Sequence, residues 1–160
     1  MGLSPFAKLV LWSGKVGSTV EILGLGFTTA SSVAFGGAPA SFTVVSDTYL
    51  KATVPANTAT GSVHVATSAA TLASSHIFLV VPVVKSFVPT SGPVGTTVTI
   101  TGTGLTGTTK VTFGSKGAAF SVNSNSQITA TVPAGAKTAK ISVLTAGGKA
   151  SSPSSFTVTP

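Results

Sequence analysis

The chain has 160 residues and is basic, because 9 lysines face only two acidic residues, Glu21 and Asp47, for a formal net charge of +7. It has no cysteine and two histidines, which excludes disulfide frameworks, thiolate zinc sites and cysteine nucleophiles. Two carboxylates are too few for a calcium or magnesium cage, so neither a metal nor another cofactor is expected. Hydrophobic residues make up 42% of the chain, which predicts a folded protein.

The chain opens on its most apolar stretch, residues 1–12, in which Leu9, Val10 and Leu11 run together. We expect this stretch to supply the first strand of the fold. The alternative is that it adds to an open strand edge of a neighbouring subunit, which would make the chain part of a surface assembly. The residues after Met1 lack the pattern of a signal peptide. Taken with the family resemblance described below, this suggests that the sequence is part of a longer protein.

Further along, polar and apolar residues alternate with a period of two, which is typical of strands with one buried and one solvated face. This pattern covers residues 62–66, 97–102, 128–132 and 140–144. Threonine fills many of the solvated positions, because its branched Cβ favours a pleated surface. The longest apolar run, residues 77–84, is far shorter than the roughly 20 residues of a membrane helix, so no membrane insertion is expected.

An internal repeat sets the organisation of the chain. When the sequence is shifted by 78 residues, residues 13–82 align with residues 91–160 without a gap, and 29 of the 70 pairs are identical. Each copy is predicted to contain about seven short strands and no long helix, which favours a β-sandwich. We therefore predict two domains, residues 1–81 and 82–160, joined by a short linker at Pro82 that limits interdomain motion.

Several motifs of the second copy resemble the IPT/TIG family of immunoglobulin-like domains. They are Pro89-Thr90-Ser91-Gly92-Pro93-Val94-Gly95, then Val98-Thr99-Ile100-Thr101-Gly102-Thr103-Gly104-Leu105, then Val111-Thr112-Phe113-Gly114 and Ile128-Thr129-Ala130-Thr131-Val132-Pro133. The first copy departs at its start, where Leu11-Trp12-Ser13-Gly14-Lys15 replaces Pro-Thr-Ser-Gly-Pro. The resemblance implies an all-β chain of two tandem immunoglobulin-like (early-set) β-sandwiches without catalytic residues. It also suggests a bacterial secreted or cell-surface protein.

The charged residues give no catalytic or nucleic-acid site. The lysines are spread along the sequence, only Lys137 and Lys140 form a close pair, and there is no arginine for base recognition. We therefore expect a solvated basic surface and no specific nucleic-acid partner. Glu21 and His64 lie on strands at outward-facing positions, and Asp47 follows a strand in a turn, where it is expected to bond its own backbone.

The repeat also sorts the aromatic residues. Most phenylalanines match an apolar residue in the other copy, which predicts a core position. Trp12 and Tyr49 instead match Thr90 and Gln127, so we expect both rings to be partly exposed. Exposed aromatic rings can contact a sugar or a partner domain, which makes Trp12 and Tyr49 the candidate ligand or partner contacts.

The sequence thus predicts a non-catalytic structural or interaction module, a spacer or stalk of a bacterial secreted or cell-surface protein. Its expected partners are neighbouring domains of a larger protein or like subunits. A carbohydrate-binding module that contacts a polysaccharide through Trp12 and Tyr49 is the alternative.

Overall fold

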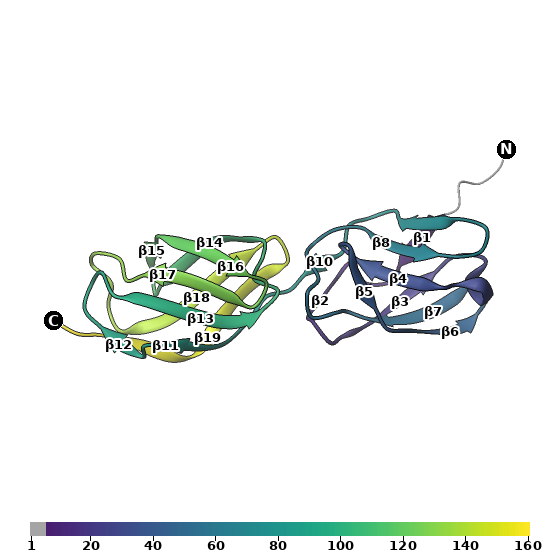
Figure 1. Cartoon of the computed structure of the whole chain (residues 1–160). Coiled ribbons are helices and arrows are strands. Elements are labelled where there is room, and N and C mark those ends of the chain that lie inside the picture. The colour runs from purple at the N-terminus through teal and green to yellow at the C-terminus, as the bar shows by residue number, and fades with distance from the viewer. Residues whose placement is uncertain (1–5) are drawn as a thin grey trace. The chain divides into compact units, whose positions relative to one another are not determined.

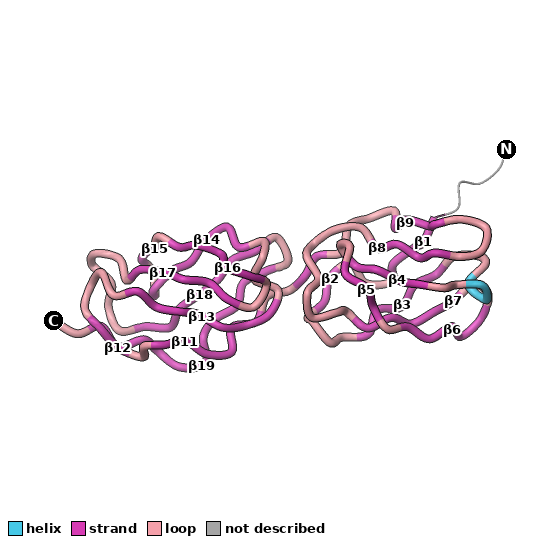
Figure 2. Tube along the Cα trace, viewed as in Figure 1, coloured by secondary structure: helices cyan, strands magenta, loops and turns pink. Residues whose placement is uncertain are grey.

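The computed structural model describes residues 6–160 and shows an all-β chain (Figure 1). The chain divides into two compact units, and the boundary between them in the sequence falls between Val80 and Val81. Strands alternate with short loops throughout both units, and the described residues include one single-turn helix (Figure 2). We call residues 6–80 the first module and residues 81–160 the second module.

The first module is a sandwich of two sheets that share strand β1. This strand pairs in parallel with β9 on one side and antiparallel with β3 on the other, which gives the continuous strand order β5-β4-β8-β9-β1-β3-β7-β6. A further short ladder joins β2 and β10 in parallel. The elements are β1 (Phe6–Leu9), β2 (Ser13–Gly14), β3 (Thr19–Leu23), η1 (Phe27–Thr29), β4 (Ser32–Phe35), β5 (Ala38–Ala40), β6 (Phe42–Ser46), β7 (Tyr49–Thr53), β8 (Val63–Ala66), β9 (Thr71–Ser74) and β10 (Leu79–Val80).

The second module repeats this arrangement with two separate sheets. One has the order β11-β13-β17-β16 and the other the order β12-β19-β18-β14-β15. The strands are β11 (Val83–Val88), β12 (Ser91–Gly92), β13 (Thr97–Thr103), β14 (Thr108–Phe113), β15 (Lys116–Ala118), β16 (Phe120–Ser124), β17 (Gln127–Thr131), β18 (Ala139–Thr145) and β19 (Gly148–Val158).

The alternation in the sequence decides which side chains form the two cores. In β13, Val98 and Ile100 are buried, whereas Thr97 and Thr101 are exposed. Of the matched aromatic residues, Phe35, Phe78, Phe113 and Phe156 are fully buried as predicted. In each module two of these rings meet edge to face, a favourable geometry for aromatic pairs. Phe42 and Phe120 are only partly buried and pack against the core of their own module.

A repeated glycine shows how closely the backbones approach. Gly102 lies in β13 opposite Val84, and a Cβ atom at this position would overlap the carbonyl oxygen of Val83. At the matched position of the first module, a Cβ atom on Gly24 would overlap the ring of Phe27. Both positions therefore require glycine, because any side chain would push β11 or η1 away.

The structure contains more strands than the sequence suggested, ten in the described part of the first module and nine in the second. The additional ones are two-residue ladders such as β2 and β10, or three-residue hairpin arms such as β5 and β15. Segments this short hold too few residues for an alternation to show in the sequence.

The N-terminal stretch lies partly outside the described residues. Its described part, Phe6–Leu9, pairs within its own module, where Phe6 and Ala7 lie beside β9 and Lys8 and Leu9 lie beside β3. This agrees with the first-strand prediction, and strand addition to a neighbouring subunit stays a prediction. No helix within residues 6–160 has the length and apolar character needed to cross a membrane.

Candidate functional site

Trp12 lies in the loop between β1 and β2 and is held in place from two directions. Its carbonyl oxygen accepts a hydrogen bond of 2.7 Å from the backbone N–H of Leu79. Its indole ring stacks on the imidazole of His76, with 4.1 Å between the ring centroids and 10° between the planes. The hydroxyl of Ser75 lies 3.1 Å from Nδ1 of His76 and helps to orient that ring.

The stack leaves one side of the indole open. Trp12 keeps 52% of its surface exposed although His76 covers one ring face, so the opposite face is available to solvent. The residues next to the pair in the sequence, Leu11 and Ile77, are also more than half exposed. An exposed aromatic face can bind a sugar ring or an apolar side chain of a partner when its opposite face is packed on another ring and apolar residues lie beside it.

Tyr49 is only partly exposed and is engaged by its neighbours on the outward face of β3 and β7. Its hydroxyl donates a hydrogen bond of 2.6 Å to Oε1 of Glu21, and Nζ of Lys51 lies 5.8 Å from the ring centroid. The hydrogen bond to Glu21, reinforced by desolvation and by the negative charge, raises the pKa of the Tyr49 phenol above its ordinary value of 10.0.

The two candidate residues therefore belong to different places on the first module. Trp12 contacts His76 and Leu79, which lie beyond β9 toward β10, whereas Tyr49 contacts Glu21 on β3. They do not share one binding platform. Their role as ligand contacts remains a prediction.

The remaining candidates of the sequence have structural or solvent-exposed positions. His64 is exposed, as its place in the alternation predicted. The expectation for Asp47 was wrong: its carboxylate accepts hydrogen bonds from the Thr28 hydroxyl and from the backbone N–H groups of Gly26 and Thr28, 19 to 21 residues away. The Thr28 hydroxyl is the main reason why the pKa of Asp47 lies below its ordinary value of 3.8. Asn125 accepts the matching bonds from Thr106 in the second module.

Among residues 6–160 there is no group of three histidine, cysteine or acidic side chains that would hold an ion.

Both modules match the same family model, described as IPT/TIG domain, over residues 5–77 and 82–158. The chain belongs to the IPT/TIG family. This identification agrees with the immunoglobulin-like sandwich seen in each TIG module and with the motifs Pro89–Gly95 and Ile128–Pro133 of the sequence. No curated protein matches the sequence.

Several solved structures resemble almost the whole chain. The surface glycan-binding protein PbSGBP-B from Prevotella bryantii shares 19% identity over 97% of this chain and 42% of its own length, with a TM-score of 0.55. SGBP-B from a complex xyloglucan utilization locus in Bacteroides uniformis shares 18% identity over 97% of this chain and 50% of its own length, with a TM-score of 0.46. The extracellular region of plexin A4 shares 22% identity over 97% of this chain and 18% of its own length, with a TM-score of 0.48.

At these identities the similarity establishes the fold alone. The chain spans half or less of the length of these solved proteins.

The structure also gathers lysines that look scattered in the sequence. Residues 110 and 149 are 39 positions apart, yet Lys110 and Lys149 both lie opposite Leu144, one on each side of β18 in the second TIG module. The lysines remain on the solvated surface, as expected, but pairing between strands brings these two together on one sheet. A separate charge count for each copy of the repeat would have indicated a basic surface on the second copy, because residues 82–160 hold six lysines and no acidic residue.

The Tyr49–Glu21 hydrogen bond predicts how the phenol titrates. Tyr49 is the one tyrosine of the chain, so a near-ultraviolet absorbance titration follows this phenol. In the native chain we expect the Tyr49 phenol to ionise above pH 10.0. In Glu21→Thr, which carries the residue found at the matched position of the second module, the pKa of Tyr49 should return toward 10.0. Because the folded pKa is raised, the stabilisation by this bond is present below pH 10.0 and is lost as the pH rises through the folded pKa.

A matched control removes the other carboxylate of the chain. Asp47→Asn also carries the residue of the second module and should leave the Tyr49 titration unchanged. An equal shift in both variants would show that net charge, and not the hydrogen bond, sets the pKa of Tyr49.

Proposed function

We propose that the chain is a non-catalytic structural and interaction module, a spacer of a bacterial secreted or cell-surface protein. The observation that carries this proposal is that each TIG module has its own closed core and that only two residues, Val81 and Pro82, separate the last strand of the first module from the first strand of the second. Proline fixes its own φ angle, and a linker of two residues leaves few freely rotating bonds. The name and bacterial source of the Prevotella bryantii protein, a surface glycan-binding protein, support the proposed location.

The buried side chains support the same role. Valine, isoleucine, leucine and phenylalanine fill both cores, while hydroxyl residues occupy many outward positions of the strands. Such a surface stays soluble with little charge. A module of about 80 residues built in this way is expected to have a stability of about 5 kcal/mol or somewhat more, which suffices for a spacer.

The spacer role predicts a narrow distribution of distances between the modules. Because the chain has no cysteine, Thr43→Cys and Ser121→Cys introduce two unique labelling sites at matched, exposed positions. Electron–electron double resonance between spin labels should give one narrow distance peak. Pro82→Gly should broaden that peak, because glycine frees the backbone between β10 and β11. A broad distribution in the parent chain would refute the spacer.

A second candidate function is carbohydrate binding, which the geometry of Trp12 favours. The open face of the indole, backed by His76 and fixed through Leu79, is already oriented for a ligand. Binding to such a site costs little ordering entropy. The name of the Prevotella bryantii protein, a surface glycan-binding protein, supplies the ligand class to test.

The fluorescence of Trp12 can report on binding at this site, because Trp12 is the one tryptophan of the chain. Titration with neutral β-linked oligosaccharides, xyloglucan fragments among them, should change its fluorescence if a sugar stacks on the ring. Trp12→Thr, the residue of the second module, should weaken binding by about 2 kcal/mol or more, the typical loss of a central aromatic anchor, measured by calorimetry. Tyr49→Gln is the matched control. If Trp12→Thr leaves every sugar affinity unchanged, carbohydrate binding at this site is refuted.

A further inference from the structure

The two TIG modules differ sharply in charge although their folds match. The second module, residues 81–160, contains six lysines and no aspartate or glutamate. The first copy contains three lysines and both acidic residues of the chain. The side-chain charge is therefore +6 in one copy and +1 in the other, from six lysines without an acid against three lysines with two acids. A repeat that keeps its core but changes its charge points to a role for the changed surface.

Three of the six lysines lie on one face, the outward face of strands β14, β18 and β19. We call this face, with its hydroxyl residues, the lysine face; it consists of Lys110, Thr112, Lys140, Ser142, Lys149 and Ser151. The register of the sheet puts Lys110, Leu144 and Lys149 in one row and Thr112, Ser142 and Ser151 in the next. All three lysines are exposed, so their ammonium groups are free to meet a ligand.

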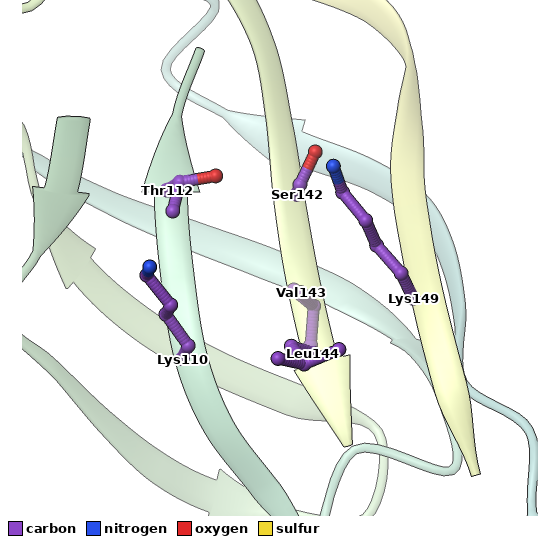
Figure 3. Close-up of a pocket in the computed structure, with 6 residues that line it drawn as sticks. All are labelled: Lys110, Thr112, Ser142, Val143, Leu144 and Lys149. Carbon is purple, nitrogen blue, oxygen red and sulfur yellow. The ribbon is translucent and has the colours of Figure 1, made fainter. Parts of the chain in front are cut away.

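The hydroxyls and the two outer lysines surround a shallow hollow of about 160 Å³. Figure 3 shows the side chains of Lys110 and Lys149 on either side of β18, with both ammonium ends directed toward the level of Thr112 and Ser142. The hydroxyl of Ser142 lies 3.0 Å from that of Ser151, so the two form one polar pair at the centre of the face. The hollow thus presents positive charge at its sides and hydroxyl groups at its centre.

The basic character continues along β18. Lys140 follows Ser142 on the same face, and Ala139 then lines a second hollow together with Lys116 and Lys137. Lys140 thus extends the charge of the lysine face along β18, whereas Lys116 and Lys137 lie at a separate hollow. Three lysines spread over one sheet face suit a polymer better than a single small anion.

The first module shows that the fold does not need these lysines. Its matched positions hold Ser32, Ala38, Ala59, Ser62 and Thr71 in place of Lys110, Lys116, Lys137, Lys140 and Lys149. The sheet of the first module nevertheless keeps the strand order β5-β4-β8-β9, which matches the order β15-β14-β18-β19 of the second. The lysines are thus dispensable for folding, and a binding role accounts for their accumulation on one sheet.

We propose that the lysine face binds an acidic polysaccharide, a chain whose sugar residues carry carboxylates at regular intervals. Lysine ammonium groups pair with carboxylates, and the accessible hydroxyls of Thr112 and Ser151 hydrogen bond with sugar hydroxyls. The second module has no side-chain carboxylate that would compete for the lysines. This site is independent of Trp12 and adds a ligand class to the proposed spacer.

The spacing of the charges favours this polymer over a nucleic acid. Lys110 and Lys149 are two strand spacings apart, roughly 10 Å. A DNA strand presents a phosphate about every 3.4 Å along the helix axis, which is far denser. A polysaccharide with a carboxylate on alternate sugars has widely spaced charges. The chain also lacks arginine, the residue best suited to bind phosphates and guanine.

The test uses the full chain and hyaluronan, in which alternate sugars carry a carboxylate. The variant Lys110→Ser/Lys149→Thr places the first-module residues in the lysine face. The control Lys8→Ser/Lys51→Thr removes the same charge from the first module and places second-module residues there. Calorimetry at low salt should show hyaluronan binding that weakens about tenfold or more in the first variant, because two charged hydrogen bonds are lost. The control should change the affinity less than twofold.

Three further ligands distinguish an acidic polysaccharide from a neutral glycan, a nucleic acid and a lipid surface. Neutral dextran should not bind, and duplex DNA and vesicles of phosphatidylserine should bind more weakly than hyaluronan at equal charge. The proposal is overturned if both lysine pairs weaken binding equally, or if dextran binds as well as hyaluronan. It is also overturned if DNA or the vesicles bind more tightly and lose this binding in Lys110→Ser/Lys149→Thr. Circular dichroism should show that both variants are folded, as expected for exposed residues taken from the sister copy.

Discussion

The edge-to-face contact between two buried phenylalanine rings is the interaction around which each module is built. Phe35 meets Phe78 at 5.1 Å between centroids and 82° between planes, and Phe113 meets Phe156 at 5.4 Å and 86°. In each pair one ring comes from a strand in the middle of the copy and the other from its end. The contact therefore ties the last segment of each copy to the body of its sandwich, and the valines and isoleucines of the alternating strands pack around it.

Once the inward positions are fixed, the outward positions are free to differ between the copies, and every candidate for binding lies there. Trp12 with His76 replaces Thr90 and Ser154, and Tyr49 replaces Gln127. The lysine face, in turn, is a property of the second copy alone. The duplication thus separates stability, which both copies share, from recognition, which each copy develops on its own surface.

The sequence predicts the fold well because a period of two translates directly into burial. The alternation of Val98 and Ile100 with threonines assigned the inward face, and the repeat identified Phe113 and Phe156 as core. It did not predict what depends on register and loop packing. The row Lys110–Leu144–Lys149 arises from pairing between distant strands, and the stack on His76 arises from two loops that meet only in the folded chain.

The independence of the two cores is tested most directly by Phe156→Ala, with hydrogen exchange followed by mass spectrometry. Loss of a buried phenylalanine costs about 3–5 kcal/mol, close to the whole stability of a module of this size. Amides of residues 82–160 should lose protection, whereas amides of residues 6–80 keep theirs, and Phe78→Ala should give the reverse pattern. Simultaneous loss of protection in both modules with either variant would contradict two self-sufficient cores.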